Sequence, residues 1–383
     1  MKIIAAPDSF KGSMSALEAA KAIENGVKRA APAAEVVLLP VADGGEGFTD
    51  AIVHAAGGEK MEAAASDPLG RRINAYYGII DHGQTAVIEM AAASGLPLLQ
   101  PDERNPMIAS TYGTGELIRH ALDQGCRRIL IGLGGSATND GGIGMAQALG
   151  YRFYDEEDRL IEPFTPQWLK LAKIDASQRD ARLSQTEFRA ACDVDAVLYG
   201  EAGASVIFGP QKGADANMVQ LLDRALERLA QRLEIDLAVD VHELKGGGAA
   251  GGLGAGMTAF CSAKLVPGSE LVLDALGFDQ HLEQCDLVIT GEGQTDAQSA
   301  LGKVPQAIAA RAKQKGVPAV CISGALKDGY EQLHECGMTA LFSLTPHPCE
   351  LGEAMDHAQK WMEDSVYEMM RLYCAIRRKS SSN

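Results

Sequence analysis

The sequence lacks several patterns that identify common classes of protein. It has eight cysteines but no C-x-x-C pair, which favours scattered buried thiols in a cytosolic chain over a metal site or a disulfide framework. No stretch approaches the roughly 18 apolar residues of a transmembrane helix, and the N-terminal apolar run is too short for a signal peptide. We therefore expect a cytoplasmic protein with no membrane partner.

Basic residues are also scarce. The chain has 35 lysines and arginines against 51 aspartates and glutamates, and its formal net charge is −16. A net-acidic chain is a poor partner for nucleic acids, because their backbone phosphates need a basic face. A small anionic substrate is still compatible with this charge, since a few local cations or amides suffice to bind it.

The best-known catalytic and nucleotide-binding signatures are missing as well. There is no G-x-x-x-x-G-K-[ST] loop, no protein-kinase signature set and no G-x-S-x-G elbow. One G-x-G-x-x-G match, at Gly246, Gly248 and Gly251, falls in KGGGAAGGLGAG (245–256), where glycine is so dense that a match carries little information. We interpret this run as a flexible loop that closes on a ligand, with a purely structural turn as the alternative.

The sequence does contain a regular alternation of short apolar runs and amphipathic helical patterns. The apolar runs are continuous, which is typical of parallel strands covered on both faces. They begin near residues 2, 34, 85, 127, 188, 286, 318 and 339. The pattern predicts an α/β fold with a doubly wound parallel sheet, and the length predicts two domains.

Polar, glycine-rich clusters follow these strands, which is where open α/β sheets bind ligands. The densest cluster is GLGGSATNDGG (132–142), which precedes a helical pattern at 144–150. Backbone amides and a helix N-terminus at such a place form a phosphate site. Asp140 could hold a Mg²⁺ there. The alternative is a structural crossover in which Asn139 or Asp140 caps the helix.

Further clusters supply charged and polar side chains at other strand ends and turns. The candidates are Asp8, Ser9, Lys11, Asp43, Glu46, Asp193, Gln211, Lys212 and Asp296, with Arg71 as a weaker one. Phosphoryl transfer needs little covalent work, because charge must be neutralised, the groups held in line and one alcohol proton accepted. Clustered amides, one or two lysines, a Mg²⁺ held by carboxylates and one free aspartate meet those needs.

Taken in order, these motifs resemble the bacterial glycerate kinase family. The matching stretches, from the first strand to about residue 325, are PDSFKGS, LPVADGGEGF, DPLGR, GLGGSATNDGG, CDVD, FGPQKGA, GGAAGGLG and GEGQTDAQSALGKVP. The resemblance implies ATP- and Mg²⁺-dependent phosphorylation of (R)-glycerate (D-glycerate) to 2-phosphoglycerate, with 3-phosphoglycerate as the alternative product. Asp195 departs from the family pattern, which often has Asn there, so we assign it no role.

The resemblance also implies two α/β domains, one inserted into the other, with the active site in the cleft between them. We expect residues 1–70 and 281–383 to form a discontinuous Rossmann-like domain, and residues 71–280 to form the inserted domain with the glycine-rich loop. The first two strands and those near 286, 318 and 339 would then share one sheet.

Residue roles follow as hypotheses from strand-end position and from this resemblance. Mg²⁺ binding or acceptance of the hydroxyl proton is expected from Asp193 or Asp296, with Lys11 as a further catalytic candidate. The phosphates of ATP are expected at Gly134, Gly135, Ser136, Thr138 and Asn139, with Gln211 and Lys212. Glycerate is expected at Asp8, Ser9, Lys11, Asp43, Glu46 and Arg71, where Lys11 would pair with its carboxylate.

Two other classes of function remain alternatives. One is an NAD(P)-dependent dehydrogenase of a small hydroxy acid that uses the G-x-G-x-x-G match, which lies far from the N-terminal strand. The other is a sugar-acid sensor that binds without turnover. A monomer and a small homo-oligomer are both compatible with the sequence.

Overall fold

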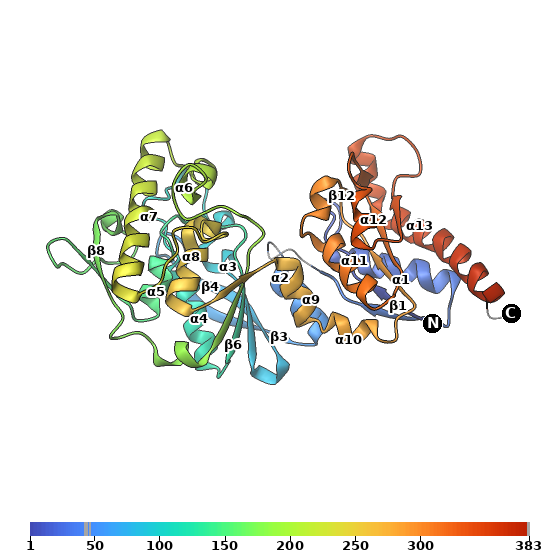
Figure 1. Cartoon of the computed structure of the whole chain (residues 1–383), viewed down its shortest axis with the longest axis horizontal. Helices are drawn as coiled ribbons and strands as arrows, with labels where there is room; N and C mark the ends of the chain where they lie inside the picture. The colour runs from blue at the N-terminus through green and yellow to red at the C-terminus, as the bar shows by residue number, and fades with distance from the viewer. Residues whose placement is uncertain (42–44, 46, 381–383) are drawn as a thin grey trace. The chain divides into compact units, whose positions relative to one another are not determined.

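The computed structural model describes residues 1–41, 45 and 47–380 (Figure 1). The chain forms two compact units: unit 1 consists of Met1–Asp43 and Val272–Asn383, and unit 2 of Gly44–Leu271. These bounds differ from the expected divisions at 70/71 and 280/281. The first division falls earlier because the strand at Glu59–Ser66 pairs with a strand of unit 2.

Unit 1 is built on a five-stranded parallel sheet in the order β15-β13-β11-β1-β2. Its strands are β1 (Lys2–Ala5), β2 (Glu35–Leu38), β11 (Leu287–Thr290), β13 (Ala319–Ser323) and β15 (Ala340–Ser343). This confirms that the first two apolar runs and those near 286, 318 and 339 share one sheet. The strand order reverses between β1 and β11, and in open α/β sheets ligands bind beyond the carboxyl ends at such a switch point.

Helices cover both faces of the unit 1 sheet, as expected for a doubly wound fold. Ile3 and Ala5 of β1 share a core with Ile23 and Met362, which lie on α1 (Ala16–Ala30) and α13 (Leu351–Ser380). The helix α11 (Val304–Gln314) contacts β11 and β13 but contributes nothing to this core, so it covers the other face. The division between the units falls within α9 (Gly268–Ala275). The smaller elements of unit 1 are α10 (Phe278–Leu282), β12 (Gln294–Thr295), the 3₁₀ helix η7 (Ala297–Ala300), β14 (Ala325–Leu326) and α12 (Gln332–Cys336).

Unit 2 contains a six-stranded mixed sheet in the order β10-β9-β6-β5-β4-β3. The strands are β3 (Glu59–Ser66), β4 (Arg72–Ile80), β5 (Thr85–Glu89), β6 (Arg128–Gly132), β9 (Glu187–Ala191) and β10 (Lys264–Val266). The neighbours from β10 to β5 are parallel, whereas β3 and β4 form an antiparallel hairpin at one edge. The sequence did not predict this hairpin, because EKMEAAAS is rich in alanine and glutamate, which are depleted in strands.

The helices of unit 2 pack around this sheet and its loops. Its core joins Ile131 of β6 with Leu117, Met145, Leu229 and Leu253, which lie on α4, α5, α7 and α8. The helices are α2 (Phe48–Ala56), α3 (Ala91–Ser94), α4 (Tyr112–Asp123), α5 (Ile143–Ala148), α6 (Ala204–Phe208), α7 (Ala216–Leu237), α8 (Ala249–Cys261), η1 (Asp81–Gly83), η2 (Leu96–Leu98), η3 (Pro101–Glu103), η4 (Pro166–Lys170), η5 (Ala181–Gln185) and η6 (Pro210–Lys212). A separate hairpin pairs β7 (Arg152–Asp155) with β8 (Leu171–Asp175).

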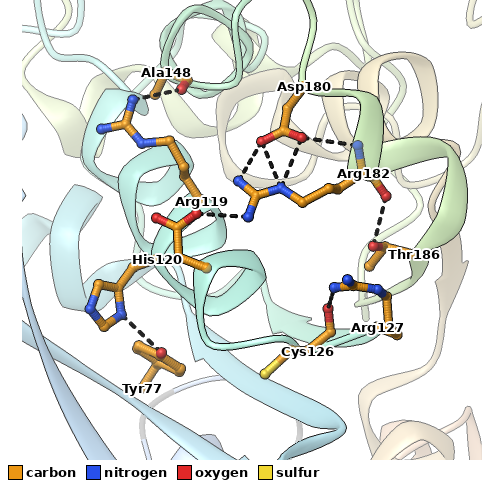
Figure 2. A network of polar contacts seen from close by, with 10 residues as sticks. Tyr77, Arg119, His120, Cys126, Arg127, Ala148, Asp180, Arg182 and Thr186 are labelled. Carbon is orange, nitrogen blue, oxygen red and sulfur yellow. Dashed lines mark hydrogen bonds and ion pairs between the residues drawn. The ribbon is translucent and has the colours of Figure 1, made fainter.

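A polar network holds α4 at the amino ends of the parallel strands. Figure 2 shows the Arg182 guanidinium facing the Asp180 carboxylate, and Arg182 also pairs with Asp123 at the end of α4. The Tyr77 hydroxyl of β4 lies 2.9 Å from Nδ1 of His120 on α4. These contacts lie at the end of the sheet where the parallel strands begin, opposite the loops that follow their carboxyl ends. Within the described residues, no helix combines the length and the apolar character needed to span a bilayer.

Candidate active site

The glycine-rich loop (residues 133–142) leaves the carboxyl end of β6. Two backbone hydrogen bonds with residues 94–96, of 2.8 and 3.0 Å, hold its middle in place. Among the described residues, none accepts a hydrogen bond from the N–H groups of Gly134, Gly135 or Ser136. All three are at least partly exposed, and Gly135 has a φ of +73°, which glycine adopts without strain. Residues 134–136, the first half of the loop, therefore present N–H groups that can donate hydrogen bonds to an anion.

The N–H groups at the start of α5 are paired within the protein, so this helix N-terminus does not add to the phosphate site as the sequence led us to expect. Buried Asp140 accepts hydrogen bonds from the N–H groups of Thr111 (2.8 Å), Gly142 (3.1 Å) and Gly144 (3.2 Å). The Met145 N–H donates to the Thr111 hydroxyl. Burial raises the pKa of the Asp140 carboxyl, and these hydrogen bonds oppose that rise. Asp140 thus takes the structural alternative and caps the helix instead of holding Mg²⁺.

Thr138 and Asn139 lie beneath the surface of the loop. Both are fully buried, and the Asn139 amide nitrogen donates to the Ser205 hydroxyl at 2.9 Å. The Thr138 hydroxyl and the Asn139 amide oxygen meet no hydrogen-bond partner within the described part of the chain. Their side chains are buried beneath the loop surface, and their expected contact with ATP remains a prediction.

Lys212 of η6 is the buried cation of this loop. Its side chain is 1% exposed, and its Nζ donates to the Ser136 hydroxyl and to the Thr138 carbonyl, both at 2.7 Å. Burial lowers the pKa of Lys212 to about 7, against the opposing effect of the Asp140 charge. A nearby anion would stabilise an ammonium group held this way, and the contact with ATP expected of Lys212 remains a prediction. Its neighbour Gln211 is exposed on the same turn.

Asp193 lies at the same edge of the unit 2 sheet as the glycine-rich loop. Gly132 of β6 is the register partner of Ala191 of β9, so Gly134 and Asp193 each stand two residues beyond paired positions. Asp193 is exposed, and one of its carboxylate oxygens accepts from the Gly268 N–H at 2.9 Å. A carboxylate beside a phosphate loop can contact a phosphate-bound Mg²⁺.

The glycine tract at 245–256 is not the flexible ligand loop that we expected. Residues 246–257 are buried, and the tract enters the start of α8. A Cβ atom on Gly251 would clash with the Thr138 carbonyl oxygen, and one on Gly248 would clash with that of Val197. The glycines of the G-x-G-x-x-G match therefore contact protein backbone, which removes the structural basis for a dinucleotide site.

Unit 1 has a cavity of about 840 Å³ at the carboxyl ends of its strands, at the switch point of the sheet. Asp8, Ser9, Lys11 and Asp296 all line this unit 1 cavity, so the structure brings together four predicted site residues. Ligand pockets commonly have volumes of about 300–1,000 Å³. The cavity therefore has more than enough space for a three-carbon acid.

A tight turn after β1 sets the position of Lys11. Phe10 and Met14 exchange backbone hydrogen bonds of 2.8 and 3.0 Å, which places Lys11 exposed at the tip of the turn. Just before it, the Asp8 carboxylate accepts from the Ser9 N–H at 2.6 Å. The short sequence PDSFKGS thus presents a carboxylate and an ammonium group to one cavity.

The two carboxylates that follow β11 differ in environment. Asp296 caps η7 by accepting from the Gln298 N–H at 2.9 Å, and its other oxygen accepts from the Gln294 amide at 3.1 Å. Partial burial raises the pKa of Asp296, but the hydrogen bonds and the Lys303 charge bring it below its ordinary value. Glu292, by contrast, is only 7% exposed, and burial raises the pKa of its carboxyl.

Glu292 and Lys303 line the unit 1 cavity but were not among the residues assigned from the sequence. Glu292 stands between two glycines at a strand end, and this position was the signal that could have selected it. Lys303 immediately precedes α11, and local sequence does not distinguish it from an exposed lysine at a helix start.

Three predicted glycerate contacts remain predictions. Asp43 and Glu46 lie outside the described residues. Arg71 belongs to unit 2, where its guanidinium forms ion pairs with Asp67 and Glu103. These pairs tie a turn to η3, and the glycerate contact expected of Arg71 remains a prediction.

The described residues contain no group of three or more His, Cys, Asp or Glu side chains that could coordinate one metal ion together. This arrangement still fits Mg²⁺, which usually keeps several waters and binds through one or two carboxylates plus substrate phosphates. Asp193 is a candidate for that role because it lies at the same edge of the unit 2 sheet as the glycine-rich loop.

Comparison with known proteins identifies the family. Residues 3–374 match the model of the "Glycerate kinase family". The chain is 48% identical to a protein of Halalkalibacterium halodurans named "Glycerate kinase", over 95% of this chain and 96% of that one. It is 47% identical to the Escherichia coli K12 protein "Glycerate 2-kinase", over 92% and 93%. A crystal structure from Salmonella typhimurium LT2, provisionally assigned as glycerate kinase 2, superposes with a TM-score of 0.90 at 46% identity and covers 99% of both chains. The chain therefore belongs to the glycerate kinase family, a family of phosphotransferases.

Proposed function

We propose that the protein transfers the terminal phosphoryl group of ATP to the 2-hydroxyl of (R)-glycerate and so forms 2-phosphoglycerate. The observation that carries this proposal is the similarity, along nearly the whole chain, to the Escherichia coli protein named glycerate 2-kinase. Two features also support it: unit 2 has a loop with exposed, unpaired amides, and unit 1 has a cavity lined by side chains of both charges.

The phosphates of ATP are assigned to the glycine-rich loop of unit 2. The N–H groups of Gly134, Gly135 and Ser136 would donate hydrogen bonds to phosphate oxygens. The Lys212 ammonium, whose Nζ contacts the Ser136 hydroxyl, would supply positive charge close to them. Gln211, exposed on the same turn, is a further candidate contact. Preorganised donors of this kind stabilise charge without reorganisation during the reaction.

Glycerate is assigned to the unit 1 cavity. Lys11 would pair with the glycerate carboxylate, and Lys303 adds a second cation to the same lining. Asp8 and Ser9 would accept and donate hydrogen bonds to the two hydroxyl groups of the substrate. Transfer requires the acceptor hydroxyl and the terminal phosphate to meet in line, and we expect this of the substrate-bound enzyme.

We assign the protein's contact with Mg²⁺ to the Asp193 carboxylate. When bound, the ion would neutralise phosphate charge. Asp296 then acts by ordering the turn before η7, through the hydrogen bonds that its two oxygens already accept.

An ADP-release assay with D-glycerate, followed by NMR of the product, tests the proposed function. We expect ADP release that depends on both Mg²⁺ and D-glycerate, and a product phosphorylated at carbon 2. A 3-phosphoglycerate product would refute the assignment of the hydroxyl, and glycerate binding without ADP release would favour the sensor alternative. We also propose a cytoplasmic location. We further propose a monomer or a small homo-oligomer, and the native mass in solution tests this oligomeric state.

A further inference from the structure

Glu292 is a buried carboxyl group that no assigned role explains. It is 7% exposed, it lines the unit 1 cavity, and no lysine, arginine or histidine within the described residues forms an ion pair with it. Burying an ionisable group without a paired charge is expensive, and such groups concentrate at functional sites. The group therefore calls for a functional explanation.

A chain of buried donors fixes the orientation of Glu292. The Thr295 hydroxyl donates to Glu292 Oε1 at 2.8 Å and lies 2.6 Å from the Ser323 hydroxyl. The Ser323 hydroxyl in turn lies 3.3 Å from the Cys321 thiol. Because Thr295 has a single proton and gives it to Glu292, the Ser323 proton points to Thr295, and the thiol proton can point to Ser323. The whole chain thus directs its donors toward the carboxylate.

We propose that Glu292 is the general base of the reaction, which accepts the proton of the glycerate hydroxyl as it attacks ATP. The inference rests on the proposed function and deepens it. The O–H bond of glycerate breaks as its oxygen bonds to the terminal phosphorus, and the bond from that phosphorus to the ADP oxygen breaks with its electron pair. The proton passes to the Glu292 carboxylate and then to solvent after the product leaves.

Glu292 suits this step better than Asp296. Asp296 is only partly buried, it caps η7 by accepting from the Gln298 N–H, and its pKa lies below the ordinary value. Burial raises the pKa of Glu292, against the hydrogen bonds from Ser299 and Thr295 and the charge of Lys303. A base with a raised pKa accepts a proton more readily near neutral pH.

The groups that face Glu292 come from several elements. They are Lys303 before α11, Asp296 before η7 and the Cys321 thiol of β13, and the cavity is also lined by Asp8 and Lys11 from the turn after β1. Any pH dependence assigned to Glu292 must therefore be checked by a variant that perturbs Glu292 and leaves these other groups in place.

The first test is Glu292→Gln, with Glu335→Gln, an exposed carboxylate of the same unit, as the matched control. General-base catalysis contributes about 10²–10⁴-fold, so kcat should fall at least about 100-fold while the dissociation constant of glycerate changes less than about threefold. The control should keep wild-type kcat. A Glu292→Gln enzyme with kcat within tenfold of wild type, or one that loses only glycerate affinity, would overturn the proposal. A wild-type enzyme that releases no ADP would instead refute the proposed function.

A second variant tests the same proposal without changing Glu292 itself. Thr295→Val deletes the donor to Glu292 with little change in volume, and the loss of that hydrogen bond should raise the Glu292 pKa further. We expect the acidic limb of the kcat–pH profile to move to higher pH than in wild type. A limb that stays in place while kcat changes would show that this carboxyl does not set the rate, and would overturn the proposal.

Discussion

The burial of the Lys212 side chain leads to a quantitative prediction about the glycine-rich loop. Its Nζ has two protein partners, the Ser136 hydroxyl and the Thr138 carbonyl, and neither carries a charge. The Lys212→Met variant keeps the length and apolar character of the side chain but removes the cation. Two separate effects are expected, one on stability and one on nucleotide binding.

The effect on stability follows from the lowered pKa. Burial takes the pKa of Lys212 from 10.5 to about 7, which corresponds to about 5 kcal/mol at 1.36 kcal/mol per pH unit. Between these two values the unfolded chain binds more protons than the folded one, so the free energy of unfolding rises with pH. From pH 7 to pH 10 the wild type should gain about 3–4 kcal/mol from this group, and Lys212→Met should not.

Urea unfolding of both proteins at several pH values measures this effect. Met also leaves the Thr138 carbonyl without its donor, at a cost of about 1–3 kcal/mol, but that loss does not vary with pH. The difference between the two unfolding free energies is therefore the informative quantity. A difference that stays constant within about 1 kcal/mol from pH 7 to pH 10 would refute the burial argument, since the linkage requires it to change.

The effect on binding follows from the same cation. Because its pKa is lowered to about 7, Lys212 loses its charge as the pH rises above neutrality, and a phosphate held by the adjacent amides would favour the charged form. Titration calorimetry with Mg-ATP in two buffers of different ionisation enthalpy should therefore detect proton uptake by the wild type. Lys212→Met should show less uptake and at least about tenfold weaker binding, because hydrogen bonds to charged groups contribute about 1.5–3 kcal/mol. Equal proton uptake by both proteins would refute the assignment.

Three further predictions concern single contacts. Lys11→Ala should raise the KM for glycerate at least about tenfold with a smaller change in kcat, whereas exposed Lys21→Ala should leave both unchanged; steady-state kinetics decides. Gly251→Ala should cost several kcal/mol in urea unfolding and weaken ATP binding because its Cβ would clash with the loop, whereas Gly316→Ala, which has a similar positive φ and no neighbour within 4 Å, should cost about 1 kcal/mol. Asp140→Asn should lower the free energy of unfolding by about 3 kcal/mol, since its amide nitrogen would face backbone donors; little loss would refute the capping role.

Most strands of the two parallel regions could be predicted from the sequence because their environment leaves a local mark, although the three-residue strand β10 was not predicted. Strands covered on both faces are mostly apolar along their length, and the eight apolar runs coincide with β1, β2, β5, β6, β9, β11, β13 and β15. The β3–β4 hairpin leaves no such mark. Its first strand is mostly alanine and glutamate, and its pairing with β4 is decided by tertiary contacts.

Burial was the part of the site that local sequence could not reveal. Asp140 and Asp193 both follow apolar strands, yet one is buried as a helix cap and the other is exposed at the sheet edge. Glu292 and Asp296 stand four residues apart in one cluster, and only the fold makes the first a buried carboxyl and the second a cap. Residue type predicts which chemistry is present, whereas packing decides which side chain is free to perform it.

The glycine density of the loop has two separate causes. A Cβ on Gly252 would lie 2.8 Å from the Cα of Gly141, and one on Gly256 would lie 3.0 Å from the Cα of Gly142. The second half of the loop and the start of α8 therefore need glycine in order to pack backbone against backbone, with no ligand involved. Only the first half, Gly134 to Ser136, combines exposure with unpaired amides above the Lys212 ammonium. A substitution that weakens ATP binding without destabilising the fold should therefore be found in the first half, since changes in the second half act through packing.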